Sequence, residues 1–276
     1  MIAVSTLQLG VFVPLTEDPR AELNKVQELG IPTCQLSFWD PDILSDELAY
    51  KVKAASEETG VTITSLWAGW PGPAVWDFYL GPVTLGLVPP AYRAERLGIL
   101  KRAAHFAALI ETENLTTHVG FIPENPGEQL YREVVAAVRE IAICCRQYGQ
   151  YFCFETGQET PITLMRTISD VGMDNLGINL DPANLLMYGK ANPVDAVEIF
   201  GSYIRGVHAK DGEYPSCGRN LGPEKPLGQG RVNFPLLVKK LKEVGYTGAL
   251  TIEREITGPQ QLADIQLARD LLLPLL

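Results

Sequence analysis

The chain has 276 residues, which is about twice the length of a typical single domain but within the range in which an α/β barrel closes as one unit. Its 46% apolar and 20% charged residues are typical of a soluble globular protein and exclude a disordered or fibrous chain. The net charge of −10 and the absence of basic runs argue against nucleic acid as a partner. No apolar run approaches the roughly 18 residues of a membrane span, so we expect no membrane partner.

The N-terminal segment is apolar, but it lacks the basic start of a signal peptide and carries Ser5, Thr6 and Gln8 where a signal peptide would be continuous. We therefore interpret this segment as the first strand of a cytoplasmic protein. The five cysteines are odd in number, irregularly spaced and mostly placed in apolar stretches. This usage favours buried thiols in a reducing compartment over a disulfide framework or a thiolate metal site.

Short segments rich in β-forming residues recur along the chain, and each is followed by an amphipathic stretch, with no linker between the units. This alternation predicts one domain over residues 1–276, with a parallel sheet. We expect eight strands, at residues 8–13, 33–39, 61–68, 114–121, 151–156, 176–180, 204–210 and 249–254. We expect helices at residues 45–59, with Ser45 as the N-cap, and at 91–111, 127–148, 162–171, 194–200, 234–244 and 260–275. Eight such units predict a single-domain TIM (β/α)8 barrel.

Two connections are longer than this pattern requires. Residues 69–90 contain five prolines and four glycines, and residues 212–230 contain three prolines and five glycines. Long loops in a compact domain usually have a function, and both follow the C-terminal ends of strands, where barrel enzymes build their sites. We expect both loops to shape a site, with simple surface elaboration as the alternative.

The alternation of side chains along a barrel strand predicts which residues face the barrel axis. In the fifth strand, Phe152 and Phe154 are bulky apolar residues that must face the helices, so Glu155 faces inward. The same argument holds for the sixth, seventh and eighth strands, where the aliphatic residues share one face. The inward faces of these strands end in Asp181, in His208 with Lys210, and in Glu253. One inward carboxylate could belong to a buried polar network, but such residues on four consecutive strands indicate a shared site.

Three carboxylates that converge without a cation would repel one another and shift toward protonation, whereas a divalent ion would satisfy them. Glu155, Asp181, His208 and Glu253 therefore predict a metal site, with buried ion pairing as the alternative. Three carboxylates and one imidazole suit one divalent ion, with Mn²⁺ favoured and Mg²⁺, Co²⁺ or Zn²⁺ as alternatives.

Barrel geometry suggests what the two outer carboxylates do. The fifth and eighth strands are three steps apart around the barrel, which leaves a gap of about 5 Å between Glu155 and Glu253 once both side chains reach inward. One reacting carbon fits in such a gap, with a carboxylate on either face. We therefore predict that Glu155 and Glu253 are the catalytic acid and base.

The segments FCFETG, NLDPANL, VHAKDG and LTIERE, together with GQGRVNF, resemble the xylose isomerase-like superfamily of sugar isomerases and epimerases. These proteins are TIM barrels, and they include ketose 3-epimerases and inosose-processing proteins. The resemblance implies that a divalent metal is held by Glu155, Asp181, His208 and Glu253, and that the two glutamates also form the acid–base pair.

Two positions depart from the ketose epimerases. Many of those enzymes carry histidine where this chain has Asn184, a difference that removes one polar contact. They also tend to have a Gly-Glu pair after the histidine of the seventh strand, whereas here the sequence is His208-Ala209-Lys210-Asp211. The lysine looks more like the inosose dehydratase branch.

Residues near the strand ends are candidates for substrate binding, namely Lys210, His118, Asn184, Trp67, Phe12 and Arg219. Lys210 could bind a substrate oxygen or neutralise a carboxylate such as Glu155, and Asp211 could cap or orient Lys210. His118 has a structural core role as its alternative, and Arg219 could instead be a solvated loop residue.

Aromatic residues near the first three strand ends face the predicted metal residues. Phe12, Trp39, Trp67 and Trp70 could form apolar walls that exclude water and orient a sugar, with ordinary packing as the alternative. His105 lies in a helical pattern without a partner at a strand end, so we interpret it as structural.

Together these features predict an enzyme that isomerises or epimerises a keto-sugar or cyclitol by proton transfer through a cis-enediolate, with one divalent metal. The alternatives are an inosose dehydratase-like lyase on the same site and a noncatalytic sugar-binding barrel. A multinuclear nuclease of this broader fold needs more histidines than the three present. We expect a small-molecule partner, and a homo-oligomer is compatible with the sequence.

Overall fold

Eight parallel strands form a closed barrel in this computed structural model, which describes residues 7–276. The order around the barrel is β1-β10-β7-β6-β5-β4-β3-β2. The strands are β1 (Gln8–Pro14), β2 (Thr33–Phe38), β3 (Thr62–Ala68), β4 (Asn114–Thr117), β5 (Tyr151–Glu155), β6 (Leu176–Leu180), β7 (Ile204–Ala209) and β10 (Ala249–Ile252). The predicted single-domain TIM barrel is therefore confirmed.

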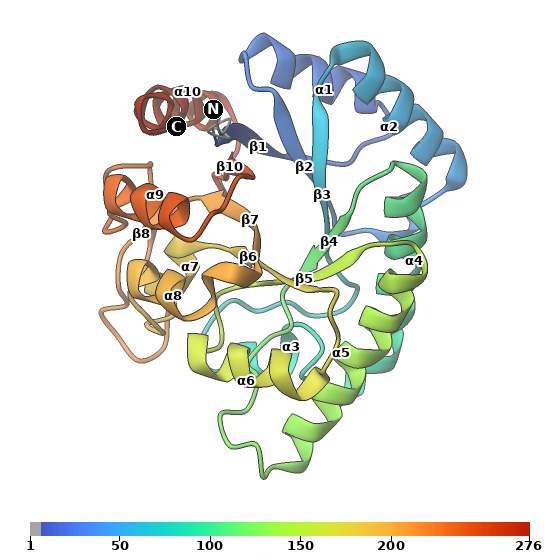
Figure 1. Cartoon of the computed structure of the whole chain (residues 1–276), viewed down its shortest axis with the longest axis vertical. Coiled ribbons are helices and arrows are strands. Elements are labelled where there is room, and N and C mark those ends of the chain that lie inside the picture. Colours follow the sequence, from blue (N-terminus) through green and yellow to red (C-terminus); the bar gives the residue numbers. More distant parts are fainter. Residues whose placement is uncertain (1–6) are drawn as a thin grey trace.

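Helices surround the barrel (Figure 1). The longer ones are α1 (Pro19–Glu28), α2 (Asp46–Thr59), α4 (Pro90–Leu109), α5 (Gln129–Gln147), α6 (Pro161–Val171), α8 (Pro193–Phe200), α9 (Phe234–Glu243) and α10 (Pro259–Leu272). Shorter elements are α3 (Gly81–Thr84), α7 (Pro182–Met187), and the 3₁₀ turns η1 (Pro41–Ile43), η2 (Gly201–Tyr203) and η3 (Leu273–Leu275). From residue 7 onward, no helix has the length and hydropathy to cross a membrane.

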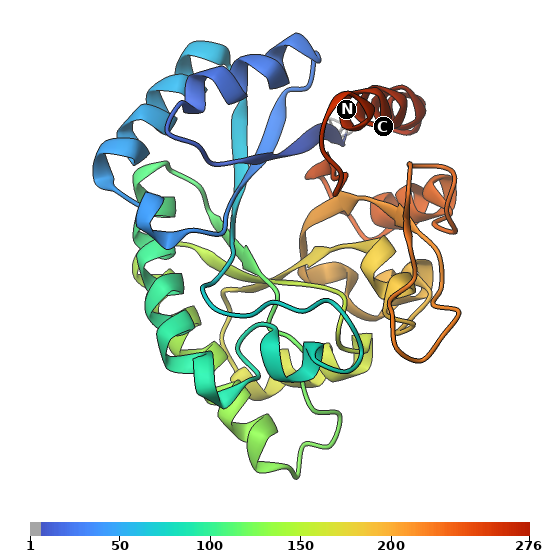
Figure 2. The same cartoon turned by 180° about the vertical axis from the view of Figure 1, so that it is seen from behind.

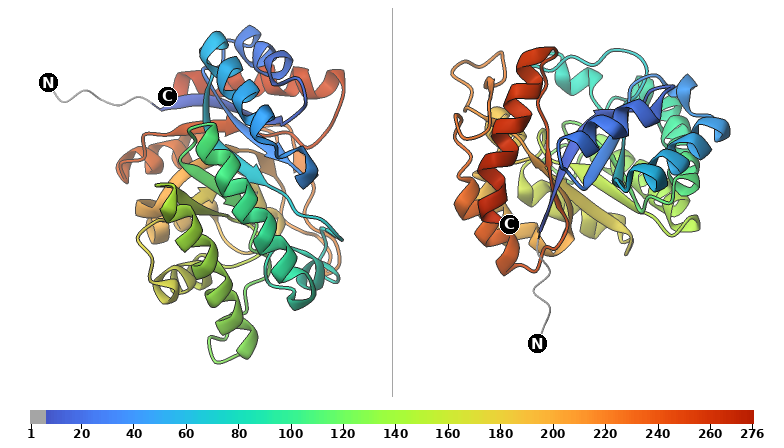
Figure 3. Two further views of the ribbon diagram at one scale, coloured as in Figure 1. Left: turned by 90° about the vertical axis from the view of Figure 1, so that its right-hand side faces the viewer. Right: turned by 90° about the horizontal axis from the view of Figure 1, so that it is seen from above.

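The barrel strands and the helices pack together through apolar faces. Phe152, Phe154 and Val207 are at most 1% exposed and lie on the outer face of the barrel. In α5, Val134, Val138, Ile141 and Cys145 recur at helical spacing and are fully buried, so they form the stripe that faces the sheet. Figure 3 shows that α10 lies beside β1, where the last helix closes the outer ring next to the first strand.

The predicted fourth strand, residues 114–121, is too long, because β4 ends at Thr117. Beyond this residue the chain turns away from β5, and the Val119 carbonyl accepts hydrogen bonds from the backbone N–H groups of Leu87 and Val88. Gly120 has a φ of +101°, and a Cβ there would lie 2.3 Å from the Leu85 carbonyl oxygen. The end of β4 is therefore determined by the loop after β3.

The five cysteines are free. Cys34, Cys145 and Cys153 are buried, as the apolar surroundings predict, and Cys144 is partly buried. Cys217 is exposed, so the buried-thiol interpretation is wrong there. This cysteine lies in a polar, glycine-containing loop in which residues 216–220 are all exposed.

The two long loops meet over the C-terminal end of the barrel. Asp77 and Asn220 form an antiparallel bridge, and the Phe78 N–H donates to the Arg219 carbonyl at 3.0 Å. The second loop also contains a short ribbon of β8 (Asp211–Gly212) and β9 (Glu224–Lys225). In Figure 2 the segment after β3, in teal, crosses in front of the barrel, and the segment after β7, in orange, lies beside it.

Candidate functional site

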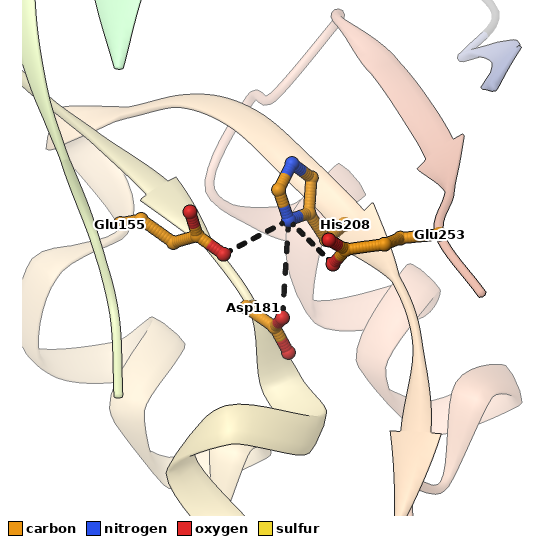
Figure 4. A group of neighbouring side chains, drawn as sticks. All are labelled: Glu155, Asp181, His208 and Glu253. Carbon is orange, nitrogen blue, oxygen red and sulfur yellow. Dashed lines mark ion pairs between the residues drawn. The ribbon is translucent and has the colours of Figure 1, made fainter. Parts of the chain in front are cut away.

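Four side chains from consecutive barrel strands converge at one point. Glu155 is the last residue of β5, Asp181 follows β6, His208 lies in β7 and Glu253 follows β10. Each offers one ligand atom, and these atoms all lie within 4.8 Å of one another. Figure 4 shows the three carboxylates around one nitrogen of His208. The alternation of side chains along the strands predicted that these four residues face the barrel axis, and the fold brings them together.

The Nδ1 atom of His208 lies at the centre of this group. It is 3.0 Å from Glu253 Oε2, 3.2 Å from Glu155 Oε1 and 3.8 Å from Asp181 Oδ2. Burial alone would lower the pKa of His208, but the negative charges of Glu253 and Glu155 outweigh it and raise this pKa well above its usual value. The cluster thus favours positive charge at Nδ1.

The hydrogen bond at Nε2 of His208 determines that Nδ1, the other ring nitrogen, keeps a lone pair for a metal. His208 Nε2 lies 2.9 Å from Gln35 Oε1, and Gln35 Nε2 donates to Asn179 Oδ1 at 3.0 Å. Since the Gln35 amide donates to Asn179, its oxygen accepts the Nε2 proton and leaves Nδ1 free as a ligand. A Cβ at Gly206 would lie 2.2 Å from Asn179 Oδ1, so only glycine leaves room for this bond.

Sequence reasoning missed Gln35. The feature of the sequence that could have indicated Gln35 is a polar residue within the apolar strand TCQLSF, at a position that faces the barrel axis. Nothing in β2 alone connects that residue with His208, which is far along the chain.

The donors fit a divalent cation. His208 Nδ1, Asp181 Oδ2 and Glu253 Oε2 are buried and have no hydrogen-bond partner, only ion-pair contacts with one another, with Glu155 and with Lys210, although buried polar atoms are usually hydrogen-bonded. Three carboxylate oxygens and one imidazole nitrogen form a donor set suited to a hard or borderline divalent ion. The cluster is therefore a candidate metal centre.

Asp181 is oriented by the helix that follows it. Its Oδ1 accepts the N–H of Asn184 at 2.8 Å and caps α7, and Pro182 occupies the first position of that helix. The Thr156 hydroxyl bonds both the N–H and the carbonyl of Asp181. With Oδ1 occupied as a cap, Oδ2 is left for the centre. Sequence reasoning did not predict this short helix, because it starts directly after the strand.

Glu155 is held by neighbours on both oxygens. Trp67 Nε1 donates to Oε2, Asn184 Nδ2 donates to Oε1 at 3.4 Å, and His118 Nε2 lies 3.4 Å from Oε2. Burial would raise the pKa of Glu155, but the positive charges of His118, His208 and Lys210 lower it to about 2. The carboxylate is therefore ionised across the physiological range.

Lys210 lies beside the centre as a buried cation. Its Nζ is 2.6 Å from Glu255 Oε1, 3.4 Å from Glu253 Oε2 and 3.5 Å from Asp181 Oδ2. The lysine thus compensates these three carboxylates rather than forming a direct pair with Glu155. Asp211 does not orient Lys210, because its carboxylate accepts four backbone N–H groups, those of Gly212, Gly228, Gly230 and Val232.

A cavity of about 380 Å³ opens above the four residues. Glu155 and Glu253 line it, as do four of the residues expected to bind substrate, namely Phe12, Trp67, His118 and Asn184. Trp39 and Trp76 form part of its wall, whereas the expected wall residue Trp70 is buried behind them. Arg254, Glu255 and Gln261 also line the cavity.

The candidate residue Arg219 and the structural residue His105 both lie outside the cavity wall. The guanidinium of Arg219 is exposed and sits over the Tyr79 ring at 5.0 Å, outside the cavity wall. Its role in substrate binding stays a prediction. His105 lies on α4, where its Nε2 is 3.1 Å from Asp46 Oδ1.

Comparison with known proteins places this geometry in a family. The sequence model of the xylose isomerase-like TIM barrel matches residues 23–272. The chain belongs to this family. Among sequence relatives, the uncharacterized protein MJ1311 from Methanocaldococcus jannaschii is 28% identical over 170 residues, which span 56% of this chain and 55% of that protein.

Solved structures with the same barrel fold resemble the chain over nearly its full length. A xylose isomerase domain protein from Planctomyces limnophilus has 34% identity and a TM-score of 0.92, with 98% of this chain and 97% of that chain covered. D-psicose 3-epimerase from Clostridium cellulolyticum H10 has 18% identity and a TM-score of 0.70, with 96% and 98% covered. The probable 3-DHS dehydratase AsbF from Bacillus anthracis has 17% identity and a TM-score of 0.70, with 96% and 98% covered. The last two show the fold alone.

Proposed function

We propose that this protein is a metal-dependent isomerase or epimerase of keto-sugars or cyclitols. One observation carries the proposal: Glu155 and Glu253 line the same cavity and belong to the same four-residue cluster. A paired acid and base on one substrate pocket is the arrangement that proton transfer at carbon requires. The epimerase among the structural neighbours is consistent with this class of reaction.

Glu155, Asp181, His208 and Glu253 would hold one divalent ion, for which we favour Mn²⁺, with Mg²⁺, Co²⁺ and Zn²⁺ as alternatives. When bound, such an ion supplies Lewis-acid stabilisation of negative charge on substrate oxygens. Gln35 keeps His208 in the tautomer that this role needs.

The two glutamates would move the proton. One carboxylate removes the hydrogen from the carbon beside the substrate carbonyl, and a cis-enediolate forms. The other returns a proton to the opposite face and inverts that carbon, whereas return to the adjacent carbon interconverts aldose and ketose. Glu155 is ionised and can therefore accept a proton, and Trp67 and Phe12 would exclude water from the reacting carbon.

A dehydratase is the second candidate, and His118 favours it. This residue lines the cavity, and its Nδ1 is buried without a hydrogen-bond partner. After the same first proton removal, a protonated His118 could deliver a proton to a departing β-hydroxyl, which leaves as water. The fold is compatible with such chemistry, since a probable dehydratase shares it.

Proton exchange tests the proposal. Purified protein with Mn²⁺ is incubated in D₂O with a panel of ketoses and inososes, and proton NMR follows the α-hydrogens. We expect exchange, and we expect Glu155→Gln and Glu253→Gln to lower its rate about 10²-fold or more. Glu124→Gln, which removes an exposed carboxylate, is the matched control.

The outcomes of this experiment distinguish an isomerase or epimerase from a dehydratase and from a noncatalytic barrel. A product that has lost one water would establish the dehydratase. Binding of a sugar without any exchange would indicate a noncatalytic barrel and overturn the enzymatic proposal. The metal content of each variant is measured in parallel, because both glutamates belong to the candidate metal centre.

A further inference from the structure

All four tryptophans of the chain lie in one cluster beside the cavity. Two of them are buried and two are exposed. Trp67 and Trp70 are 5% and 4% exposed, whereas Trp76 is 38% and Trp39 is 46% exposed. The proposed proton transfer uses only the inner part of this surface, so the two outer rings are left without a role.

The two exposed rings, Trp39 and Trp76, form the part of the cavity wall beyond the residues that contact Glu155. Trp67 contacts Glu155 directly. The ring centre of Trp39 is 5.1 Å from that of Trp67, and the ring centre of Trp76 is 5.2 Å from that of His118, which lies beside Glu155. The rings of Trp39 and Trp76 are 6.3 Å apart at an interplanar angle of 85°. We call Trp39 and Trp76 the tryptophan shelf. A reacting sugar held at Glu155 would contact Trp67, so a group attached to that sugar would reach the shelf.

The shelf is held in place by buried contacts. Trp76 belongs to the loop after β3, and the buried guanidinium of Arg96 donates to four carbonyls of that loop, those of Pro71, Pro73, Thr84 and Gly86. Trp39 lies against the backbone of Gly69, where a Cβ would come within 2.8 Å of the indole. Rigid aromatic surface that stays exposed is unfavourable in water, and at the mouth of a cavity it indicates a binding surface.

Polar groups line the other side of the same cavity. Glu255 is exposed, and its carboxylate is held by Lys210 Nζ at 2.6 Å. Gln261 also lines the cavity, and its Nε2 donates to the Arg254 carbonyl at 2.9 Å. The mouth therefore presents aromatic rings together with hydrogen-bonding groups. A pyranose ring has the matching chemistry, because its C–H groups form an apolar face and its hydroxyls lie around the edge.

We infer that the substrate is a glycosylated keto-sugar, whose second ring binds the tryptophan shelf while the first ring lies between Glu155 and Glu253. This inference rests on the proposed function, since the first ring is the reacting sugar. The cavity volume of about 380 Å³ lies in the range of roughly 300–1,000 Å³ for pockets that enclose drug-sized ligands.

The test compares D-fructose with isomaltulose and lactulose, two disaccharides in which the ketose carries a second ring. Dissociation constants come from calorimetry with the metal-loaded protein, and α-proton exchange comes from NMR. We expect the disaccharides to bind about tenfold more tightly than fructose. Trp39→Ala and Trp76→Ala should weaken binding of the disaccharides more than binding of fructose and so remove most of that preference, whereas Trp39→Phe, which keeps a flat ring, should preserve it.

Tyr50→Ala is the matched control, because Tyr50 is an aromatic residue on α2 that is 60% exposed and lies outside the cavity wall. Exchange of fructose without a preference for either disaccharide overturns the inference and leaves the proposed function standing. Equal losses for fructose and disaccharides in the tryptophan variants also overturn it. Tighter binding of the disaccharides that depends on the tryptophan shelf, without proton exchange in any sugar, supports the site for the second ring. That result overturns only the proposed function.

Discussion

Gln35 and His208 illustrate how one hydrogen bond controls the chemistry of a residue. Their strands, β2 and β7, are not neighbours in the barrel, so the bond crosses its interior. It assigns the proton to Nε2 and directs Nδ1 toward the three carboxylates. A ring that lacked this acceptor could rotate or change tautomer, and its nitrogen would be a poorer ligand.

We predict that Gln35→Leu weakens Mn²⁺ binding about 10–100-fold, because the Nε2 proton loses its acceptor. Calorimetric titration of the metal-free protein measures the change. Ser37→Ala is the control, since Ser37 lies two residues further along β2 and donates to the Val13 carbonyl rather than to His208. Unchanged Mn²⁺ affinity in Gln35→Leu would show that the tautomer of His208 does not depend on Gln35.

The four clustered residues were predictable from β5, β6, β7 and β10 because alternation has a period of two and can be read within one strand. Glu155, for example, follows from its position beside Phe154. The partners of Lys210 were not predictable in the same way. Its closest contact, Glu255, lies beyond a different strand and approaches only when the two strand ends are side by side.

At the scale of elements, the start of a helix was predictable from the capping residue next to it. Ser45 was predicted to cap α2, and its side chain accepts the Leu48 N–H at 3.2 Å. Gly60 adopts the left-handed conformation directly after this helix, as expected for a glycine at that position. In contrast, the end of β4 depends on the loop of residues 85–88, and β4 itself carries no signal for it.

The loop after β3 depends on α4 through Arg96. This side chain is 1% exposed and reaches carbonyls on both sides of the loop. Burial lowers the pKa of Arg96 to about 10, so it stays charged at neutral pH. The same guanidinium lies 5.1 Å from the Trp70 ring. The helix thereby positions the loop that contributes Trp76 to the cavity wall.

We predict that Arg96→Leu lowers the free energy of unfolding by about 2–5 kcal/mol, because buried carbonyls lose their donors. Arg102→Leu, on the same helix but exposed, donates to a single carbonyl, that of Pro41, and should cost less than about 1 kcal/mol. Urea unfolding measures both variants. Equal effects would show that the guanidinium is not what holds the loop.

At the scale of the whole molecule, the candidate metal centre exists only when the barrel is closed. Its residues span Glu155 to Glu253 and come from four strands, so the unfolded chain has no comparable site. A ligand that binds only the folded state stabilises it by mass action. Metal binding and barrel stability should therefore be coupled.

We predict that Mn²⁺ at about 100 times its dissociation constant at pH 8 raises Tm by about 5 °C and that a chelator reverses the effect. With the Mn²⁺ concentration kept at the value used at pH 8, the rise should be smaller at pH 6. The pKa of His208 is raised in the metal-free protein, so below that pKa a proton on Nδ1 competes with the metal, and lowering the pH strengthens this competition. Scanning calorimetry at both pH values measures the shift.

Asp181→Asn provides the control, because it keeps the cap on α7 through its side-chain oxygen but removes one charge from the centre. The Mn²⁺-induced rise in Tm should shrink in this variant at both pH values. An equal rise in the parent protein and in Asp181→Asn would mean that the ion binds elsewhere.

The amino-acid sequence by itself determined the repeated β/α units, the barrel they form and the inward direction of Glu155, Asp181, His208 and Glu253. These features follow from apolar periodicity within short segments, which each segment carries locally. Only the tertiary structure decided that Gln35 orients His208, that Lys210 pairs with Glu255, and that Trp39 and Trp76 extend the cavity wall. Such contacts join residues from strands and loops far apart in the chain, and they depend on the register at which the barrel closes.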